Sequence, residues 1–356
     1  MQSVMFDDIR GNWISDNLIH NRINTSWFPS ESVTLTMQMR NRFMYGETIK
    51  YSPGYAENID RENGFMDLSV NILNENSFFL NAAIDRIYLQ VTSGKLVTTV
   101  GRQRINWGIS SVWNPNDLFN VQNYFDFDYI EQPGSDAIRM QYYTGASSSA
   151  ELALKVDRNK KITSAALYRF TTGSYDFQIL AGMLSGEDLV TGLGWSGDIE
   201  KIGFKGEATY LHPFRNFRDT SGVLLVSVGG DYMFSNSMFL QFEALYSKMP
   251  AGRSIANFLS WYQETLTVKN LSFTDVSLFG SFSYPVSPLL NINIAGMYFP
   301  KLKGFFAGPG LDYSLSDNMQ FSMISQFFSG EFPDILTQKN ERTNLFLGFI
   351  RYRLNF

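Results

Sequence analysis

Polar and apolar residues alternate along segments of about 10 to 15 residues, and such segments recur from the beginning of the chain to its end. In the last segment, residues 343–356, Ile350 and Tyr352 alternate with Arg351 and Arg353. A period of two places successive side chains on opposite faces of a β-strand. The sequence therefore predicts an all-β protein whose strands each have one apolar and one more polar face.

Seventeen segments show this strand pattern. They are residues 17–28, 32–45, 81–92, 95–108, 136–144, 148–157, 161–171, 175–184, 188–196, 201–212, 222–234, 238–248, 273–284, 289–299, 305–316, 319–329 and 343–356. Outer-membrane β-barrels of bacteria have an even number of strands and both termini on the periplasmic side. We therefore expect one more short strand at residues 4–7, which brings the number to 18, with 16 strands as the alternative.

The connections between these segments alternate between two classes. Short polar turns occupy residues 29–31, 93–94, 145–147, 172–174, 235–237, 286–288 and 316–318, and long loops occupy residues 46–80, 109–135, 249–272 and 330–342. Short turns on one rim and long loops on the other are typical of outer-membrane barrels. The predicted fold is a single transmembrane antiparallel β-barrel. Residues 67–72 in the first long loop are predicted to form either a further strand or a short helix.

Composition supports a membrane barrel and excludes other classes. The 356 residues include 15% aromatic residues and no cysteine, and the mean hydropathy is only -0.14. No apolar run reaches the length of a membrane helix, whereas alternating lipid-facing and lumen-facing residues dilute the average hydropathy of a barrel. A net charge of -5 argues against binding to nucleic acid. We predict one domain over residues 1–356.

The ends of the chain point to the cell outer membrane. The last strand ends in the aromatic residue Phe356, which resembles the signal by which Gram-negative barrels are recognised for insertion. Met1 is followed by neither a basic region nor an apolar region of the kind that forms a signal peptide. We expect that a signal peptide ahead of this sequence has been removed.

Two short motifs carry a resemblance to a family. Residues 101–108 read GRQRINWG and residues 114–117 read NPND, with Asp85-Arg86 before them and residues 133–136 (PGSD) after them. This pattern, over residues 17–143, resembles alginate-export-like and uncharacterised porin families of Gram-negative outer membranes. The resemblance implies a passive outer-membrane channel or exporter and no particular substrate.

The polar faces of the first and last strands carry arginine. If the more apolar face of each strand contacts lipid, arginine on the other face points into the lumen, since arginine on the lipid face costs about 2 to 4 kcal/mol at the membrane midplane. Closure of a barrel brings its last strand next to its first. Nine residues are thereby predicted to form one arginine wall in the lumen: Arg22, Arg40, Arg42, Arg86, Arg102, Arg104, Arg139, Arg351 and Arg353.

Acidic residues are predicted at two other places. Later strands direct Glu151, Asp157, Asp176, Glu207, Asp231 and Glu243 inward, with Lys155 and Lys205 among them. A basic wall facing a more acidic wall produces a field across the pore that orients charged solutes. We expect the loop at residues 109–135 to fold partly into the barrel and to bring Asp126, Asp128 or Glu131 toward the arginines. Structural neutralisation and solute selection are both open as roles for these charges.

Other kinds of site have weaker support. His20 and His212 are the only histidines, and His212 with Ser227 or Ser247 forms no hydrolase motif. The acidic residues lack the spacing of a calcium loop, so neither a metal nor a cofactor is expected. Six aromatic residues could stack on sugars or, alternatively, form an interfacial belt and pack the loop: Trp107, Trp113, Tyr124, Phe125, Phe127 and Tyr129.

The function expected from the sequence is that of a porin or channel, not an enzyme. It would pass small hydrophilic, anionic or zwitterionic solutes by diffusion or export, with outer-membrane lipid as its surroundings. The alternative is a non-conducting barrel that serves as a scaffold or subunit of a larger outer-membrane complex. In that case, other outer-membrane proteins would be its partners.

Overall fold

The computed structural model describes residues 2–6, 13–121, 134–215, 217–248, 267–272, 274–333 and 340–355. Within these ranges the chain forms one sheet of 19 strands. The strands are β1 (Gln2–Phe6), β2 (Ile14–Ser30), β3 (Val33–Gly46), β4 (Ser69–Asn74), β5 (Phe78–Ser93), β6 (Leu96–Gln103), β7 (Ser135–Tyr143), β8 (Ser148–Val156), β9 (Ile162–Thr172), β10 (Tyr175–Leu184), β11 (Asp188–Ile199), β12 (Ile202–Pro213), β13 (Val223–Met233), β14 (Phe239–Ser247), β15 (Val276–Ser287), β16 (Leu290–Phe299), β17 (Gly304–Ser316), β18 (Met319–Pro333) and β19 (Asn340–Leu354).

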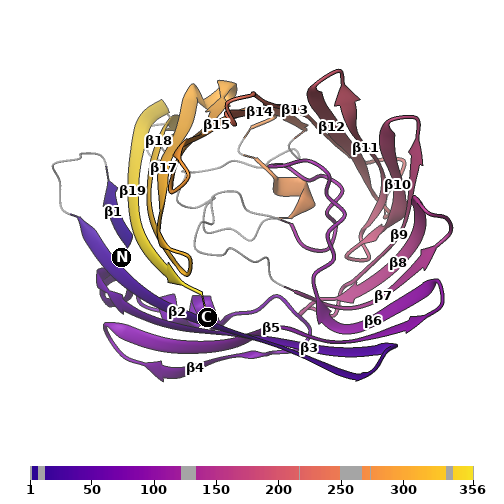
Figure 1. The fold of residues 1–356 in the computed structure, drawn as a ribbon, viewed down its shortest axis with the longest axis horizontal. Coiled ribbons are helices and arrows are strands. Elements are labelled where there is room, and N and C mark those ends of the chain that lie inside the picture. The colour runs from indigo at the N-terminus through magenta and orange to yellow at the C-terminus, as the bar shows by residue number, and fades with distance from the viewer. Residues whose placement is uncertain are drawn as a thin grey trace.

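Eighteen of these strands follow one another around the barrel (Figure 1), as predicted. Each pairs antiparallel with its neighbours, and β1 pairs with β19 on one edge and with β2 on the other. The additional strand β4 pairs with the edge of β5 opposite β3, at the end of β5 that β6 does not reach. β1 therefore lies between β2 and β19, which brings the first strand of the chain next to the last.

The first long loop contains more regular structure than the sequence pattern indicated. Two short helices, α1 (Glu47–Tyr51) and α2 (Tyr55–Asp60), precede β4, which lies close to the segment predicted as a strand or a helix. Two single turns of 3-10 helix, η1 (Val268–Asn270) and η2 (Pro300–Leu302), lie in later loops. None of the helices among the described residues has the length and apolar character needed to cross a membrane.

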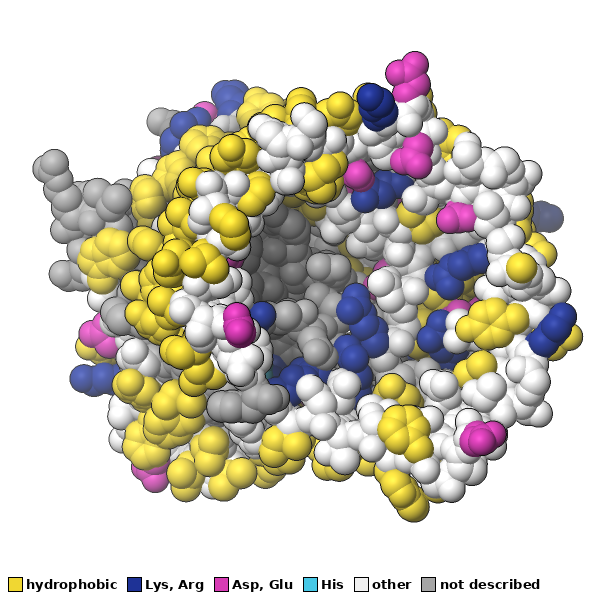
Figure 2. Space-filling model, viewed as in Figure 1, with side chains coloured by type: hydrophobic (Ala, Val, Ile, Leu, Met, Phe, Trp, Pro, Cys, Tyr) yellow, Lys and Arg dark blue, Asp and Glu magenta, His cyan; other side chains and the backbone are white. Residues whose placement is uncertain are grey.

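The alternation in the sequence corresponds to an outside and an inside of the barrel. On β2, Ile19, Ile23 and Trp27 are exposed on the outer surface, and on β19 Ile350 and Tyr352 are exposed in the same way. Figure 2 shows hydrophobic side chains over the outer surface and Lys and Arg side chains in the central hollow. The outer face of these strands is therefore suited to contact with lipid, as predicted from the more apolar face of each strand.

Glycine sets the geometry of the tight turns on one rim. Gly94 joins β5 to β6 with φ +57, and Gly173 joins β9 to β10 with φ +61, and neither has an atom within 4 Å of the position of a Cβ. The positive φ, not a lack of space, therefore favours glycine at both positions. Turns of this kind keep one rim short and leave the long loops on the other.

Candidate functional site

The chain enters the lumen where β6 ends. We call residues 104–121 the inward segment, which follows the inside of the wall formed by β8 to β14 (Figure 1). β6 ends at Gln103 and not at residue 108, because the next N–H groups bond to side chains instead of a neighbouring strand: Ile105 donates to Asn120 Oδ1 at 3.0 Å. Arg104 and Asn106, predicted on the strand, therefore belong to the inward segment.

Two buried glutamates hold the inward segment to the wall. Glu207 accepts hydrogen bonds from the backbone N–H groups of Ile109, Ser110 and Asn116. Glu243 accepts from the N–H groups at positions 111, 112 and 113 at 3.0, 3.0 and 2.7 Å. Both glutamates are at most 3% exposed. Each carboxylate satisfies three N–H groups of a buried, irregular backbone, and hydrogen bonds to an ionised acceptor are the stronger kind.

A third acidic residue, Glu151, links the inward segment to the arginines. It accepts hydrogen bonds from the indole N–H of Trp107 and from Arg139, whose Nε and Nη2 lie 2.7 and 2.8 Å from the two carboxylate oxygens. The Nη1 of Arg169 lies 3.7 Å from the same carboxylate. On the neighbouring part of the wall, Lys155 donates to the carbonyl of Phe119 at 2.7 Å. One wall of the lumen is thus occupied by contacts with the inward segment.

Apolar side chains complete this attachment. Trp107 is fully buried, and its ring lies edge-on to Phe119 with centroids 4.8 Å apart. Trp113 makes a similar contact with Phe279 on β15, at 6.4 Å. Each aromatic pair contributes about 0.5 to 1.5 kcal/mol beyond the area that it buries. The inward segment is therefore held by both polar and apolar contacts.

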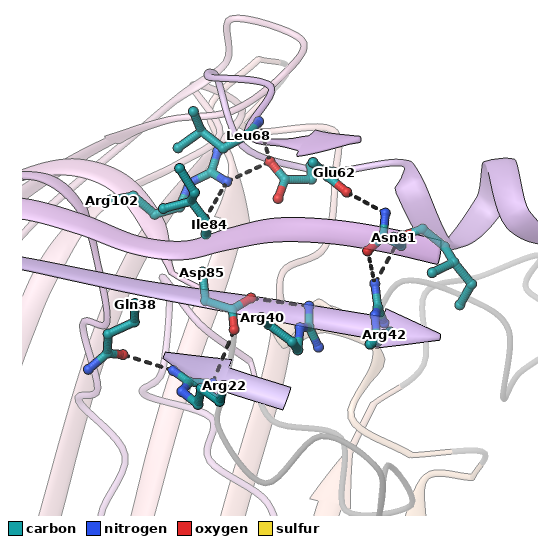
Figure 3. A network of polar contacts seen from close by, with 12 residues as sticks. Arg22, Gln38, Arg40, Arg42, Glu62, Leu68, Asn81, Ile84, Asp85 and Arg102 are labelled. Carbon is teal, nitrogen blue, oxygen red and sulfur yellow. Dashed lines mark hydrogen bonds and ion pairs between the residues drawn. The ribbon is translucent and has the colours of Figure 1, made fainter. Parts of the chain in front are cut away.

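The opposite wall carries a cluster of paired arginines (Figure 3). Arg22 on β2 and Arg40 on β3 lie directly opposite each other in the sheet, where like charges repel. Asp85 lies between them, 3.1 Å from Arg22 Nη1 and 3.1 Å from Arg40 Nη2. Arg42 donates to the amide oxygen of Asn81 at 2.9 Å. The sequence did not identify Asp85 as the counter-charge of these arginines.

A β-bulge explains why Asp85 was missed. The register of β3 with β5 shifts between Gln38 and Met39, so that Gln38 pairs with Arg86 and Met39 pairs with Ile84. Asp85 is the extra residue between these two pairs. A bulge changes which face a side chain joins, so Asp85 reaches the lumen although strict alternation assigns it to the outer face. At Asp85-Arg86, the regular alternation of inward and outward side chains is therefore interrupted.

Arg102 lies at the end of β6 in a second ion-pair cluster. Its Nε donates to Asp136 at 2.7 Å, its Nη1 donates to Glu62 at 2.5 Å, and it also donates to the carbonyl of Met66. Arg102 is only 3% exposed. Glu62 comes from the first long loop, so Arg102 fixes that loop against β6 and β7. Glu62 and Asp136 were also absent from the predicted site.

The remaining predicted residues lie at separate places and do not form one cluster. Arg86, Arg351 and Arg353 are half-buried on β5 and β19, and Arg104 is half-buried in the inward segment. Asp157 follows β8 and accepts from the N–H of Lys161, Asp176 accepts from the hydroxyl of Thr171, and Asp231 pairs with Lys205 at 3.1 Å. Asp126, Asp128 and Glu131 lie outside the described residues.

Residues proposed for other kinds of site have different surroundings. Trp107 and Trp113 are buried by protein and present no face for sugar stacking, while residues 124, 125, 127 and 129 lie outside the described ranges. The ring of His212 stacks on Phe217 at 3.9 Å, and the hydroxyl of Ser227 donates to Glu243 at 2.9 Å. Among the described residues, no group of three or more His, Cys, Asp or Glu side chains is arranged to hold a metal ion.

Asp117 makes the attachment of the inward segment depend on pH. Burial raises the pKa of Asp117 to about 8; Glu207 adds to this rise, and the N–H of Asn120 and the charge of Arg104 oppose it. The packed segment therefore keeps a proton that a released segment loses above its ordinary pKa near 4. The contribution of Asp117 to the attachment is therefore largest at acid pH, decreases as pH rises from about 4 to about 8, and stays constant above that.

The melting temperature as a function of pH tests this linkage. We expect it to fall between about pH 4 and 8 in the wild-type protein, and the slope to become shallower in Asp117→Asn, which cannot ionise. Asp312→Asn, which alters a carboxylate on β17, serves as the control and should keep the wild-type slope. An equal slope in all three proteins would mean that Asp117 does not hold its proton.

Comparison with solved structures shows a shared fold. The chain matches OccAB2 of Acinetobacter baumannii with a TM-score of 0.58 and 9% identity, over 99% of this chain and 96% of that chain. OccAB3 of the same species matches with a TM-score of 0.57 and 10% identity, over 99% of this chain and 97% of that chain. OccK8 (OprE) of Pseudomonas aeruginosa matches with a TM-score of 0.57 and 8% identity, over 99% of this chain and 96% of that chain.

The fold that this chain shares with these proteins is a single antiparallel β-barrel of the outer-membrane type. It supports the predicted location in the cell outer membrane of a Gram-negative bacterium. No family model and no curated protein matches the chain. The resemblance of residues 101–108 and 114–117 to alginate-export-like porins therefore remains an expectation.

Proposed function

We propose that this chain is an outer-membrane porin or channel, and not an enzyme, that passes small hydrophilic solutes by diffusion or export. We further propose that these solutes are anionic or zwitterionic. The observation that carries the proposal is the difference between the two walls of the lumen. Arginines line one wall, whereas the buried glutamates of the other wall bond to the inward segment.

The charges on the two walls act differently on a solute. Glu151, Glu207 and Glu243 are each at most 3% exposed. Hydrogen bonds from the inward segment occupy the oxygens of Glu207 and Glu243, and Trp107 together with Arg139 occupies those of Glu151. Their charge is therefore directed at protein N–H groups. Arg22, at 17% side-chain exposure, lies nearer to the lumen. A solute passing between the two walls would meet guanidinium groups more directly than carboxylates.

Arginine suits this role because its charge persists at all relevant pH values and because its planar donors match a carboxylate or a phosphate. The pairing of Arg22 and Arg40 with Asp85 lowers the repulsion between the two guanidinium groups. Structural neutralisation and solute selection therefore coexist in one cluster. Asp126, Asp128 and Glu131 remain our candidates for acids that narrow the space between the walls.

Solute flux through the purified protein tests the proposal. Liposomes containing the protein should swell in isotonic solutions of small amino acids and small carboxylates, faster than liposomes without it. A barrel that inserts but supports neither swelling nor ionic current would contradict the proposal. If such a barrel also co-purified with the same outer-membrane proteins, it would be a scaffold subunit.

A further inference from the structure

A cavity lies in the lumen on the side of the short turns, away from the arginine cluster around Asp85. It has a volume of about 360 Å³, and it lies between Ile109 of the inward segment and the wall formed by β7 to β11. This volume falls within the range of small-molecule sites, roughly 300 to 1,000 Å³. The residues that line the cavity include Tyr143, Ser149, Arg169, Asp176 and Ser196, whose side chains can form hydrogen bonds with a ligand.

The sheet register brings these polar groups together. Arg169 on β9 pairs with Ser149 on β8 and with Gln178 on β10. Asp176, two residues before Gln178, pairs with Ser196 on β11. Arg169 and Asp176 are therefore diagonal neighbours on one face, with Cα atoms roughly 7 to 8 Å apart. A cation, an anion and two hydroxyl groups thus line one small cavity.

Arg169 is held loosely, in contrast to Arg139. Its Nε lies 3.4 Å from the amide oxygen of Gln178, its Nη2 lies 3.4 Å from the carbonyl of Asn106, and its Nη1 lies 3.7 Å from Glu151. Arg139 bonds to the same glutamate at 2.7 and 2.8 Å. The Arg169 side chain is 35% exposed. Its guanidinium can therefore turn toward a ligand at small cost, since Arg139 already compensates Glu151.

We propose that this cavity binds a neutral, polyhydroxylated solute of the size of a monosaccharide. The guanidinium of Arg169 donates to hydroxyl oxygens, and the carboxylate of Asp176 accepts from hydroxyl groups. Ser149 and Ser196 can do both, and the ring of Tyr143 offers an apolar surface. A solute that carries a single charge would be attracted by one of these two groups and repelled by the other. The opposite charges together favour a ligand without net charge.

This subsite goes beyond the proposed passage of anionic and zwitterionic solutes, and binding to it does not require solute flux. Calorimetric titration of the purified protein in detergent with D-glucose therefore tests it separately from the channel function. We expect D-glucose to bind the wild-type protein. We expect Asp176→Asn to weaken this binding about tenfold, which corresponds to about 1.4 kcal/mol.

Charged probes and a matched variant make the test specific. D-gluconate should bind the wild-type protein more weakly than D-glucose, and it should bind Asp176→Asn more tightly than it binds the wild type, because a repelling charge is removed. Asp312→Asn changes a lumen carboxylate that bonds to Asn293 and Ser322, and it should leave D-glucose binding unchanged. The proposal is overturned if D-glucose does not bind, if Asp176→Asn binds it as tightly as the wild type, or if D-gluconate or glycine binds the wild type more tightly.

Discussion

Replacing Glu243 with alanine is expected to release the inward segment from β14, and hydrogen exchange should report the release directly. Glu243 accepts the N–H groups of Ser111, Val112 and Trp113 and the hydroxyl of Ser227. Buried donors left without an acceptor cost roughly 1 to 3 kcal/mol each. A loss of at least about 3 kcal/mol in local stability corresponds to on the order of a hundredfold faster exchange at these three amides.

A surface carboxylate provides the control for this variant. Glu187 pairs with Lys161 at 2.6 Å in the connection between β10 and β11, and its side chain is 59% exposed. Glu187→Ala should therefore leave exchange in residues 111–113 unchanged, since exposed ion pairs contribute little. If exchange at residues 111–113 were equally slow in Glu243→Ala and in the wild type, Glu243 would not be what holds the inward segment.

Replacing Arg102 with glutamine is expected to destabilise the folded barrel by about 3 to 5 kcal/mol, the usual cost of breaking a buried ion pair from one side. Arg102 is 3% exposed and bonds to Asp136, Glu62 and the carbonyl of Met66. Its removal leaves Asp136, itself 7% exposed, without its cation. Urea unfolding of the protein in lipid vesicles measures the difference.

Two comparisons distinguish the buried pair from a general effect of losing arginine. Arg342→Gln removes an exposed arginine 3.7 Å from Glu331 and should change stability by less than about 1 kcal/mol. The double variant Arg102→Gln, Asp136→Asn should lose less stability than the sum of its single variants, because the neutral pair leaves no unpaired charge. A loss in Arg102→Gln no larger than in Arg342→Gln would show that this cluster is not important for stability.

The alternation of side chains predicted the strands because lipid and lumen impose opposite requirements on successive residues. This constraint acts all around the barrel, so it predicted 17 of the 18 strands and placed most of their boundaries within a few residues. The remaining strand followed from the even number of strands in such barrels. It failed where other interactions replace strand pairing. β6 ends at Gln103 because the N–H of Ile105 bonds to Asn120, a contact with no period in the sequence.

The functional contacts were harder to predict than the strands. The alternation of polar and apolar residues alone placed Glu207 and Glu243 inward. Their partners, however, are backbone N–H groups, which every residue except proline has. The sequence therefore contained no signal for their role in holding the inward segment. Asp85 was missed because a bulge reverses its face, and Glu62 was missed because it lies in a long loop without a regular pattern.

The reversal potential of the wild-type protein in a planar lipid bilayer, measured across a gradient of KCl, tests the central claim most directly. If guanidinium groups control the lumen while the glutamates of the opposite wall are bound by the inward segment, chloride should permeate faster than potassium. The reversal potential should then have the sign of an anion-selective channel, and it should decrease in size as salt screens the arginines. A cation-selective reversal potential, or a barrel that carries no current in any salt, would contradict this account.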